Sequence, residues 1–179
     1  MRLSLGSRSY DLATRALVMA SAQRVCDIAG AVAAGADIVE VAHLQRPSTV
    51  DVAIAVAPRD VDELEAGLAA GASVVRLGLD VPAGSLRCCA KALVAVIVGP
   101  SQLAAVEAAG VGGDRIVVCD GDVSGPYPVL VDMTAPNCPL AAMAVAVIRG
   151  ARIVRIGPAD VRSARRVCRT LAAVMARTR

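Results

Sequence analysis

A repeated pattern of helix, glycine and strand constrains this sequence more than any other feature. Four segments each end an Ala-rich helical stretch at a glycine and continue as a short apolar run. The glycines, Gly35, Gly71, Gly110 and Gly150, recur roughly every 40 residues, a period typical of supersecondary repeats. Glycine just past a helix adopts the left-handed conformation without a Cβ penalty and turns the chain into the next strand. Each repeat therefore predicts a helix followed by a strand.

Further apolar runs precede the helices, so the pattern predicts alternating strands and helices. The additional strands are expected at 17–20, 52–56, 93–98 and 129–131, and the helices at 22–34, 60–70, 100–109, 140–149 and 160–177. This alternation favours parallel strands. The connections after the even-numbered strands, such as 43–50 and 120–128, are too short for a usual crossover. We expect an α/β fold, a shortened (β/α)8 TIM-barrel-like domain over 1–179 that lacks one or more outer helices.

Composition limits the core and the partners. The hydrophobic fraction is 56%, mostly Ala and Val, with no Trp, no Phe and two Tyr, which suits Val-rich parallel strands under closely packed helices. The net charge is +3, and its excess lies in the arginines of the last helix and tail, which we interpret as a solvated helix face. Nucleic-acid binding would need stacking aromatic residues, so we expect no nucleic-acid partner.

The remaining composition indicates a cytoplasmic protein without a structural metal. The stretch 1–12 alternates polar and apolar residues and lacks the apolar segment of a signal peptide. The longest uncharged stretches, 92–106 and 133–148, are too short to span a membrane and contain prolines. The six cysteines form no C-x-x-C pair and there is one histidine, so we expect neither a disulfide framework nor a metal site.

Barrel active sites are built at the C-terminal ends of strands, where this chain has few reactive residues. Asp120 and Asp122 could bind a guanidine-like edge or Mg²⁺, but Asp-Gly-Asp is more typical of a turn. Arg155 could bind an anion or stack on a flat heterocycle, or form a rim salt bridge with Asp132 or Asp120. The single histidine, His43, could titrate near neutral pH or ligate a metal, although a lone loop histidine more often does neither.

Three segments together resemble a known family. They are 3–20 (LSLGSRSYDLATRALVMA), 35–49 (GADIVEVAHLQRPST) and 143–167 (MAVAVIRGARIVRIGPADVRSARRV). They resemble the dihydropteroate synthase family, the pterin-binding (β/α)8 barrels of folate biosynthesis: its N-terminal hairpin and first strand, its G-A-x-I-I-D-V-G-G-E-S-T-R-P segment, and its last strand and closing helix. The resemblance covers nearly the whole chain and implies a pterin-binding barrel.

The functional positions that the resemblance implies are mostly changed. The family's Asn-Val-Thr-Pro-Asp-Ser-Phe-Ser loop after the first strand is missing, because the chain passes from Met19 almost directly into a helix. On the fourth strand, the family's Asn-Asp pair is matched by Arg76 and Leu77. The lysine of the seventh-strand Ser-Arg-Lys is matched by Pro136.

The resemblance implies three retained candidates for ligand binding. Asp120 matches the aspartate that pairs with the pterin ring, and Arg155 matches the arginine of Arg-x-His that stacks on the pterin and helps to bind an anion. Arg46 follows the second strand in an Arg-Pro pair. The histidine of Arg-x-His is replaced by Gly157. No residue is expected to be catalytic and none to bind a metal.

These observations predict a dihydropteroate synthase-like protein that is catalytically degenerate and acts as a binding or partner protein, with a pterin-like small molecule as ligand and a homo- or hetero-oligomeric state. One alternative is an active folate-pathway transferase of the dihydropteroate synthase type, or a related pterin or phosphate-ligand enzyme with an altered substrate, which could use Mg²⁺ but no other cofactor. Another is a structural oligomerisation partner, because missing outer helices would leave Val-rich strands uncovered.

Overall fold

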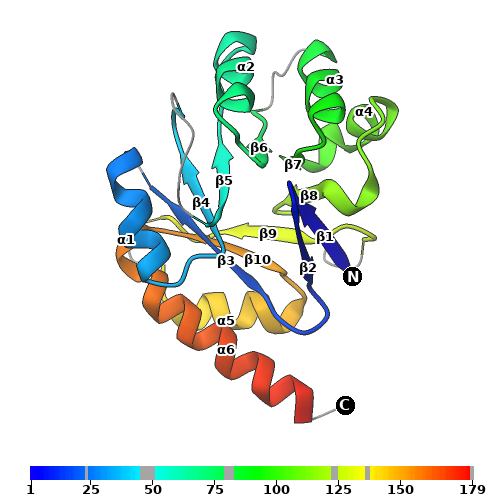
Figure 1. The fold of residues 1–179 in the computed structure, drawn as a ribbon. Coiled ribbons are helices and arrows are strands. Elements are labelled where there is room, and N and C mark those ends of the chain that lie inside the picture. Colours follow the sequence, from blue (N-terminus) through cyan, green and yellow to red (C-terminus); the bar gives the residue numbers. More distant parts are fainter. Residues whose placement is uncertain (23, 45–50, 79–82, 122–124, 136–137, 178–179) are drawn as a thin grey trace.

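Eight parallel strands form a closed barrel, preceded by a small antiparallel hairpin (Figure 1). The computed structural model describes the chain except for residues 23, 45–50, 79–82, 122–124, 136–137 and 178–179. The hairpin is β1 (Arg2–Leu5) and β2 (Arg8–Asp11); the barrel strands are β3 (Leu17–Ser21), β4 (Ile38–Val41), β5 (Ala53–Val56), β6 (Val74–Arg76), β7 (Ala95–Val98), β8 (Ile116–Cys119), β9 (Val129–Asp132) and β10 (Ile153–Ile156). The last strand, β10, pairs with both β9 and β3 and closes the barrel. The expected (β/α)8 architecture is confirmed.

Helices cover most of the connections between strands. The described α-helices are α1 (Ile28–Ala33), α2 (Val61–Ala69), α3 (Ala83–Ala92), α4 (Leu103–Ala108), α5 (Leu140–Arg149) and α6 (Val161–Arg177), with short 3-10 turns η1 (Val25–Asp27), η2 (Pro100–Gln102), η3 (Gly113–Arg115) and η4 (Pro158–Asp160). Among the described residues, no helix joins β4 to β5 or β8 to β9. The barrel is therefore shortened as expected, at its second and sixth connections.

Helix α3 corrects the expectation of a short connection after every even strand, because it follows β6, the fourth strand of the barrel. Its buried stripe is narrow. Only Ser85, Leu86 and Cys89 among its described side chains are buried, and the rest of the helix is small, charged or partly exposed. A stripe with a single large apolar residue gives little of the helical periodicity on which a sequence-based prediction depends.

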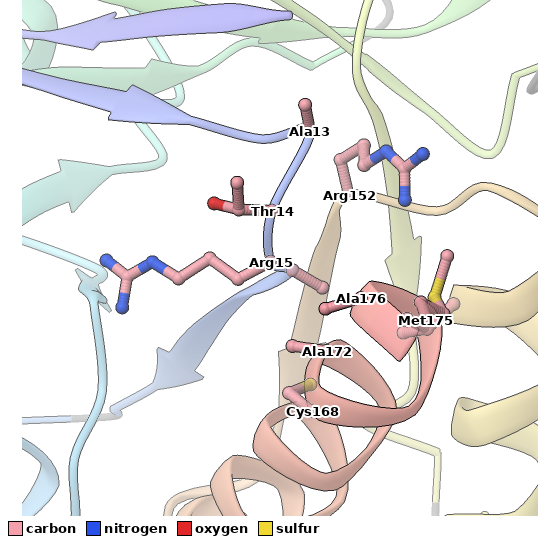
Figure 2. Close-up of a pocket in the computed structure, with 10 residues that line it drawn as sticks. Ala13, Thr14, Arg15, Arg152, Cys168, Ala172, Met175 and Ala176 are labelled. Atoms are coloured by element: carbon pink, nitrogen blue, oxygen red, sulfur yellow. The ribbon is translucent and has the colours of Figure 1, made fainter. Parts of the chain in front are cut away.

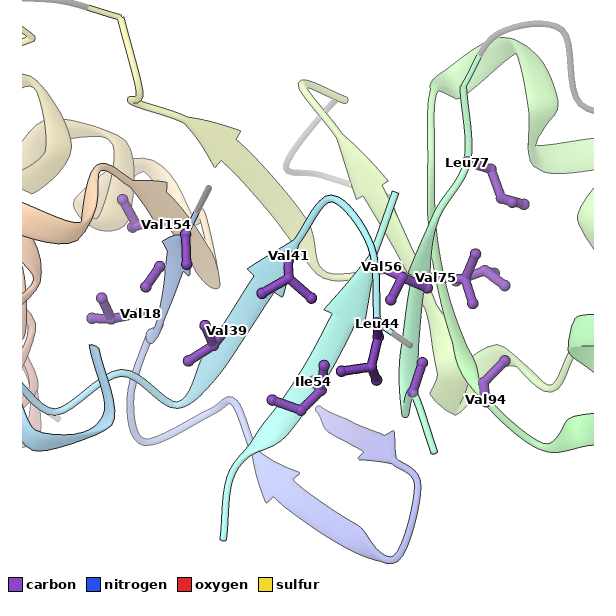
Figure 3. Close-up of a cluster of buried hydrophobic side chains, with 14 of the residues drawn as sticks. Val18, Val39, Val41, Leu44, Ile54, Val56, Val75, Leu77, Val94 and Val154 are labelled. Carbon is purple, nitrogen blue, oxygen red and sulfur yellow. The ribbon is translucent and has the colours of Figure 1, made fainter. Parts of the chain in front are cut away.

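Side-chain alternation along the strands divides the core in two. One set of residues, including Leu17, Met19 and Ile38, fills the barrel interior, and Leu3, Leu5 and Leu12 around the hairpin pack into the same cluster. The other set faces outward toward the helices (Figure 3). This is the two-residue period of a strand buried on both faces.

The outward faces of β4 and β5 are buried although no described helix joins these strands. Val41 and Val56 are 1% and 2% exposed, and Leu44, just past β4, belongs to the same buried cluster (Figure 3). In the connection between β8 and β9, the partly buried Tyr127 packs against this cluster. The expectation that missing helices would leave these Val-rich strands uncovered is therefore wrong, because residues of the short connections cover them.

The four repeat glycines all have positive φ angles, as their positions predicted: +99° at Gly35, +91° at Gly71, +83° at Gly110 and +119° at Gly150. Each follows a helix and precedes the next barrel strand. At Gly71 a Cβ would meet no atom within 4 Å. The requirement for glycine at this position is therefore one of backbone conformation and not of space.

Replacing Gly71 by alanine is expected to destabilise the protein by about 1 to 2 kcal/mol, because an L-residue is strained in the left-handed region. Gly30→Ala is the matched control. Gly30 lies inside α1, also with nothing within 4 Å of an added Cβ, so alanine there should stabilise by about 0.5 to 1 kcal/mol. Urea unfolding followed by circular dichroism measures both changes. Equal effects of the two substitutions would contradict the conformational argument.

Candidate functional site

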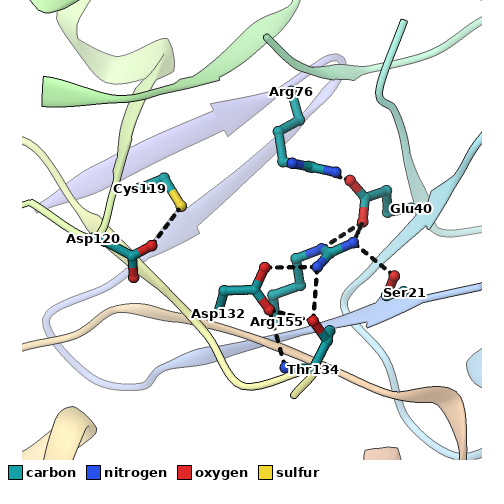
Figure 4. Close-up of polar contacts among 8 residues, drawn as sticks. All are labelled: Ser21, Glu40, Arg76, Cys119, Asp120, Asp132, Thr134 and Arg155. Atoms are coloured by element: carbon teal, nitrogen blue, oxygen red, sulfur yellow. Dashed lines mark hydrogen bonds and ion pairs between the residues drawn. The ribbon is translucent and has the colours of Figure 1, made fainter. Parts of the chain in front are cut away.

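A layer of polar side chains lines the C-terminal mouth of the barrel (Figure 4). In β4, Ile38 points into the barrel and Glu40, two residues later, occupies the next inward position. The same alternation places Arg155 after Ile153 in β10. The inward positions at the strand ends are held by Ser21, Glu40, Arg76, Cys119, Asp132 and Arg155. At the mouth, polar residues thus replace the apolar filling that the described residues provide deeper in the barrel.

Glu40 lies at the centre of this layer. Its side chain is only 4% exposed and its two oxygens accept hydrogen bonds from two different arginines. Arg76 Nε donates to Oε1, and Arg155 Nε donates to Oε2 at 2.5 Å. A buried carboxylate needs such partners because its desolvation is costly. Glu40 therefore fixes both guanidinium groups at the mouth.

Arg155 is held from three further directions (Figure 4). Its Nη1 donates to Asp132 Oδ2 at 2.7 Å and to Thr134 Oγ1 at 3.1 Å, and its Nη2 donates to Ser21 Oγ at 2.8 Å. Its side chain is 11% exposed. Of the roles that the sequence left open for Arg155, the structure realises the salt bridge with Asp132. Each of its three nitrogens has a partner within the protein.

The four charged groups balance one another. Two guanidinium groups, of Arg76 and Arg155, face the two carboxylates of Glu40 and Asp132. Burial raises the pKa of Asp132, but hydrogen bonds from Thr134 and the charge of Arg155 outweigh it and hold that pKa below its ordinary value. Its contribution to stability is therefore present above the unfolded pKa of about 4 and is lost as the pH falls through the lower folded value.

Asp120 lies outside this network. It follows β8 with a φ of +51° and is exposed, and its carboxylate accepts a hydrogen bond from Cys119 Sγ at 3.3 Å. No ion pair or hydrogen bond between Asp120 and Arg155 occurs in the described part of the chain. Asp122, its expected companion, lies outside the described residues. The thiol of Cys119 is the inward-facing group here, and burial, with the hydrogen bond to Asp120, raises its pKa to about 12.

A cavity of about 310 Å³ opens at the mouth beside Glu40. The inward positions of β5 are alanines, Ala53 and Ala55, and Ala57 lies just beyond the strand, so this side of the mouth has room. The cavity is lined by Ser21, Ala22, Glu40, Val41, Ala42, His43, Ala57, Arg59, Arg76 and Arg155. Arg76 and Arg155 both belong to the network and line the cavity, and the side chain of Arg76 is the more exposed, at 35% against 11%.

His43 joins a separate polar cluster at the rim of this cavity. Arg59 Nη2 donates to His43 Nε2 at 2.8 Å, and Glu63 Oε1 lies 3.6 Å from His43 Nδ1. Because arginine can only donate, His43 Nε2 is the acceptor of this hydrogen bond. The described residues contain no group of three or more His, Cys, Asp or Glu side chains placed to hold a metal ion.

A second cavity, of about 260 Å³, lies at the opposite end of the barrel, where the chain enters β3 and β10 (Figure 2). Its walls come from the linker before β3, the residue before β10, and helices α5 and α6, and they include Arg15, Arg152 and Met175. Arg15 is already paired with Asp37 at 3.2 Å and lies over the Tyr10 ring. The cavity is otherwise mainly apolar, so the mouth remains the candidate functional site. None of the helices described is both long and apolar enough to cross a membrane.

Solved structures with a similar fold include dihydropteroate synthases. The chain aligns with the enzyme of Yersinia pestis at 18% identity and a TM-score of 0.81, covering 98% of this chain and 99% of that one. The enzyme of Xanthomonas albilineans with 4-aminobenzoic acid aligns at 18% identity and a TM-score of 0.82, covering 98% of each chain. The enzyme of Thermus thermophilus aligns at 20% identity and a TM-score of 0.81, covering 97% of this chain and 99% of that one.

This chain has the fold of the dihydropteroate synthases. No protein-family model matches the sequence, and neither does any curated protein, so the likeness is one of fold. The structural likeness agrees with the resemblance of the sequence segments, and it extends over nearly the whole chain as that resemblance did.

Of the three ligand-binding candidates carried over from dihydropteroate synthases, the structure places two. Arg155 lies inside the mouth, Asp120 lies on its rim, and Arg46 lies outside the described residues. Glu40 was missed as a candidate, and Arg76 was noted only as a departure from the family. The sequence signal that could have found them is the alternation of side chains along a strand. Glu40 follows the inward-facing Ile38 by two positions, and Arg76 follows the inward-facing Val74 by two.

Glu40→Gln is expected to destabilise the protein by about 3 kcal/mol, because it removes the anion that compensates two partly buried cations. The double variant with Arg76→Gln should recover part of this loss, since one cation leaves with the anion. Asp62→Asn, an exposed carboxylate in the first turn of α2, controls for the loss of one negative charge. Chemical unfolding measures all three. A loss from Glu40→Gln no larger than that from Asp62→Asn would disprove the central role of Glu40.

Cys119 is expected to be alkylated by iodoacetamide much more slowly than the exposed Cys26 between pH 7 and 9. The thiolate is the reactive form, and with a pKa of about 12 the Cys119 thiol stays protonated in this range. Peptide mapping by mass spectrometry at several time points gives both rates. Preferential alkylation of Cys119 would instead identify it as an activated nucleophile.

Proposed function

We propose that this chain is a binding protein built on the dihydropteroate synthase fold, whose mouth binds a small, flat heterocycle of the pterin type without forming pteroate. The observation that carries the proposal is the closed, charge-balanced network of Glu40, Arg76, Arg155 and Asp132 beside an open cavity. It combines a place for a ring with two guanidinium groups whose charges are already compensated by carboxylates.

The cavity supports binding. Its volume of about 310 Å³ falls at the lower end of the range for small-molecule sites. Arg76 presents a planar guanidinium to it, held by Glu40 at one nitrogen, and such a group can stack on a flat ring or donate to its acceptor atoms. Solved dihydropteroate synthases include complexes with 6-chloroguanine and with a pterine-sulfa conjugate, which are flat heterocycles of this kind.

The charge balance favours a neutral ring over a phosphorylated one. A transferase that releases pyrophosphate must stabilise the negative charge that develops on the leaving group. Here all three nitrogens of Arg155 are engaged by protein acceptors. The lysine of the family pattern is matched by Pro136, and the Cys119 thiol is protonated at neutral pH. These features support a mouth that binds and does not catalyse.

Calorimetric titration with a reduced pterin is expected to show binding at the mouth. Titration with the diphosphate of that pterin is expected to show weaker binding at the mouth, measured as the part of the heat that Arg76→Ala removes. Arg76→Ala should weaken pterin binding at least tenfold, because it removes the guanidinium that faces the cavity. Arg87→Ala, an exposed arginine of α3, is the matched control and should change the affinity less than twofold. A pteroate-forming assay with the pterin diphosphate and 4-aminobenzoic acid should give no product above background.

Three results would overturn parts of this proposal separately. The absence of both binding heat and a thermal shift with either pterin would disprove the binding function. Pteroate formation that is abolished by Asp120→Ala would show an active folate-pathway transferase and remove the interpretation of catalytic degeneracy. Weakening by Arg87→Ala equal to that by Arg76→Ala would move the binding away from the mouth.

A further inference from the structure

A strongly basic groove lies between α1 and α6, away from the residues that line the mouth. Figure 1 shows α1, in blue, beside the orange first part of α6. The groove has a volume of about 510 Å³ and is lined by Ala34, Gly35, Arg162, Arg165, Arg166, Arg169 and Thr170. Each of the four arginines has others three or four positions away along α6, so they lie on one side of the helix. Four guanidinium groups therefore serve a single groove.

One of these arginines is fixed in place. The stem of Arg165 packs on Gly35, where a Cβ would come within 3.3 Å of Arg165 Cγ. Its Nη1 donates to Asp37 Oδ2 at 2.7 Å. Asp37 is itself buried and accepts a hydrogen bond from the backbone N–H of Val18 at 3.0 Å. Because the stem and the head of Arg165 are both held, one wall of the groove is preorganised.

The other three arginines have no ion-pair partner in the part of the chain that the structure describes. Asp37 is shared between Arg165 and Arg15. Within the described part of the chain, no carboxylate lies within 4 Å of Arg162, Arg166 or Arg169, all of which are exposed. Like charges four residues apart on a helix repel one another. This face of α6 therefore has a surplus of positive charge that a bound anion would relieve.

We propose that this groove binds a small molecule that carries a di- or triphosphate group. Guanidinium groups bind phosphate oxygens through paired, charge-assisted hydrogen bonds, and several of them match more than one phosphate. The Thr170 hydroxyl lies in the same lining and can donate one more hydrogen bond. The volume is that of a small-molecule site. The lining has no aromatic residue on which a base of single-stranded nucleic acid could stack.

Calorimetric titration of the full chain with inorganic orthophosphate, pyrophosphate and tripolyphosphate at about 0.15 M NaCl tests the proposal. Affinity should rise along this series, because each added phosphate reaches a further arginine. The double variant R166Q/R169Q should weaken tripolyphosphate binding at least tenfold, and R166K/R169K, which keeps the charge but loses the planar fork, by less. R149Q/R177Q removes the same charge from exposed arginines outside the groove and should change affinity less than twofold.

Several outcomes would overturn the proposal. No heat with tripolyphosphate would exclude a phosphate site. Equal weakening by R166Q/R169Q and R149Q/R177Q would show diffuse attraction to a basic surface. Cosedimentation of the chain with phosphatidylglycerol vesicles, without binding of any free phosphate, would assign the arginines to a lipid surface. Each variant is checked by circular dichroism, and R166Q/R169Q should unfold at no lower temperature than the parent because it relieves repulsion within α6.

Discussion

The buried carboxylate of Glu40 organises the mouth of the barrel, because its two oxygens tie together side chains from strands that are far apart in sequence. Arg76 of β6 and Arg155 of β10 meet on this one group, 36 and 115 residues away from it. Through Arg155 the network extends to Asp132 of β9 and Ser21 of β3. A partly satisfied network of buried charges is worse than an apolar core. Each member is therefore constrained by all the others.

The parts of the fold that follow from local physics could be predicted from the sequence. Gly71 needs only its own backbone conformation to end α2, so its role was visible in the helix, glycine and strand pattern. Helix α3 was missed because its buried stripe holds one large apolar residue, Leu86. Glu40 was missed for a different reason. Its partners come from β6 and β10, and nothing in the segment Ile-Val-Glu-Val indicates which strands will face it.

The shortened barrel depends on small residues as much as on its missing helices. Interior positions such as Ala53, Ala55 and Ala95 are fully buried, and Ala57 lines the cavity at the mouth, where a larger residue would fill it. On the outside, Leu44 and Tyr127 cover strands that no described helix joins. A core that is mostly Ala and Val can be covered by short connections, because its outward-facing side chains project little beyond the strands.

Charge distinguishes the two proposed sites and predicts different ligands for them. At the mouth, the cations Arg76 and Arg155 are matched by Glu40 and Asp132, so a bound group gains little from carrying negative charge. In the groove between α1 and α6, Asp37 compensates only Arg165 of the four arginines. Electrostatic attraction acts most strongly where positive charge is not already neutralised. A neutral ring should therefore prefer the mouth, and a phosphorylated molecule should be drawn to α6 instead.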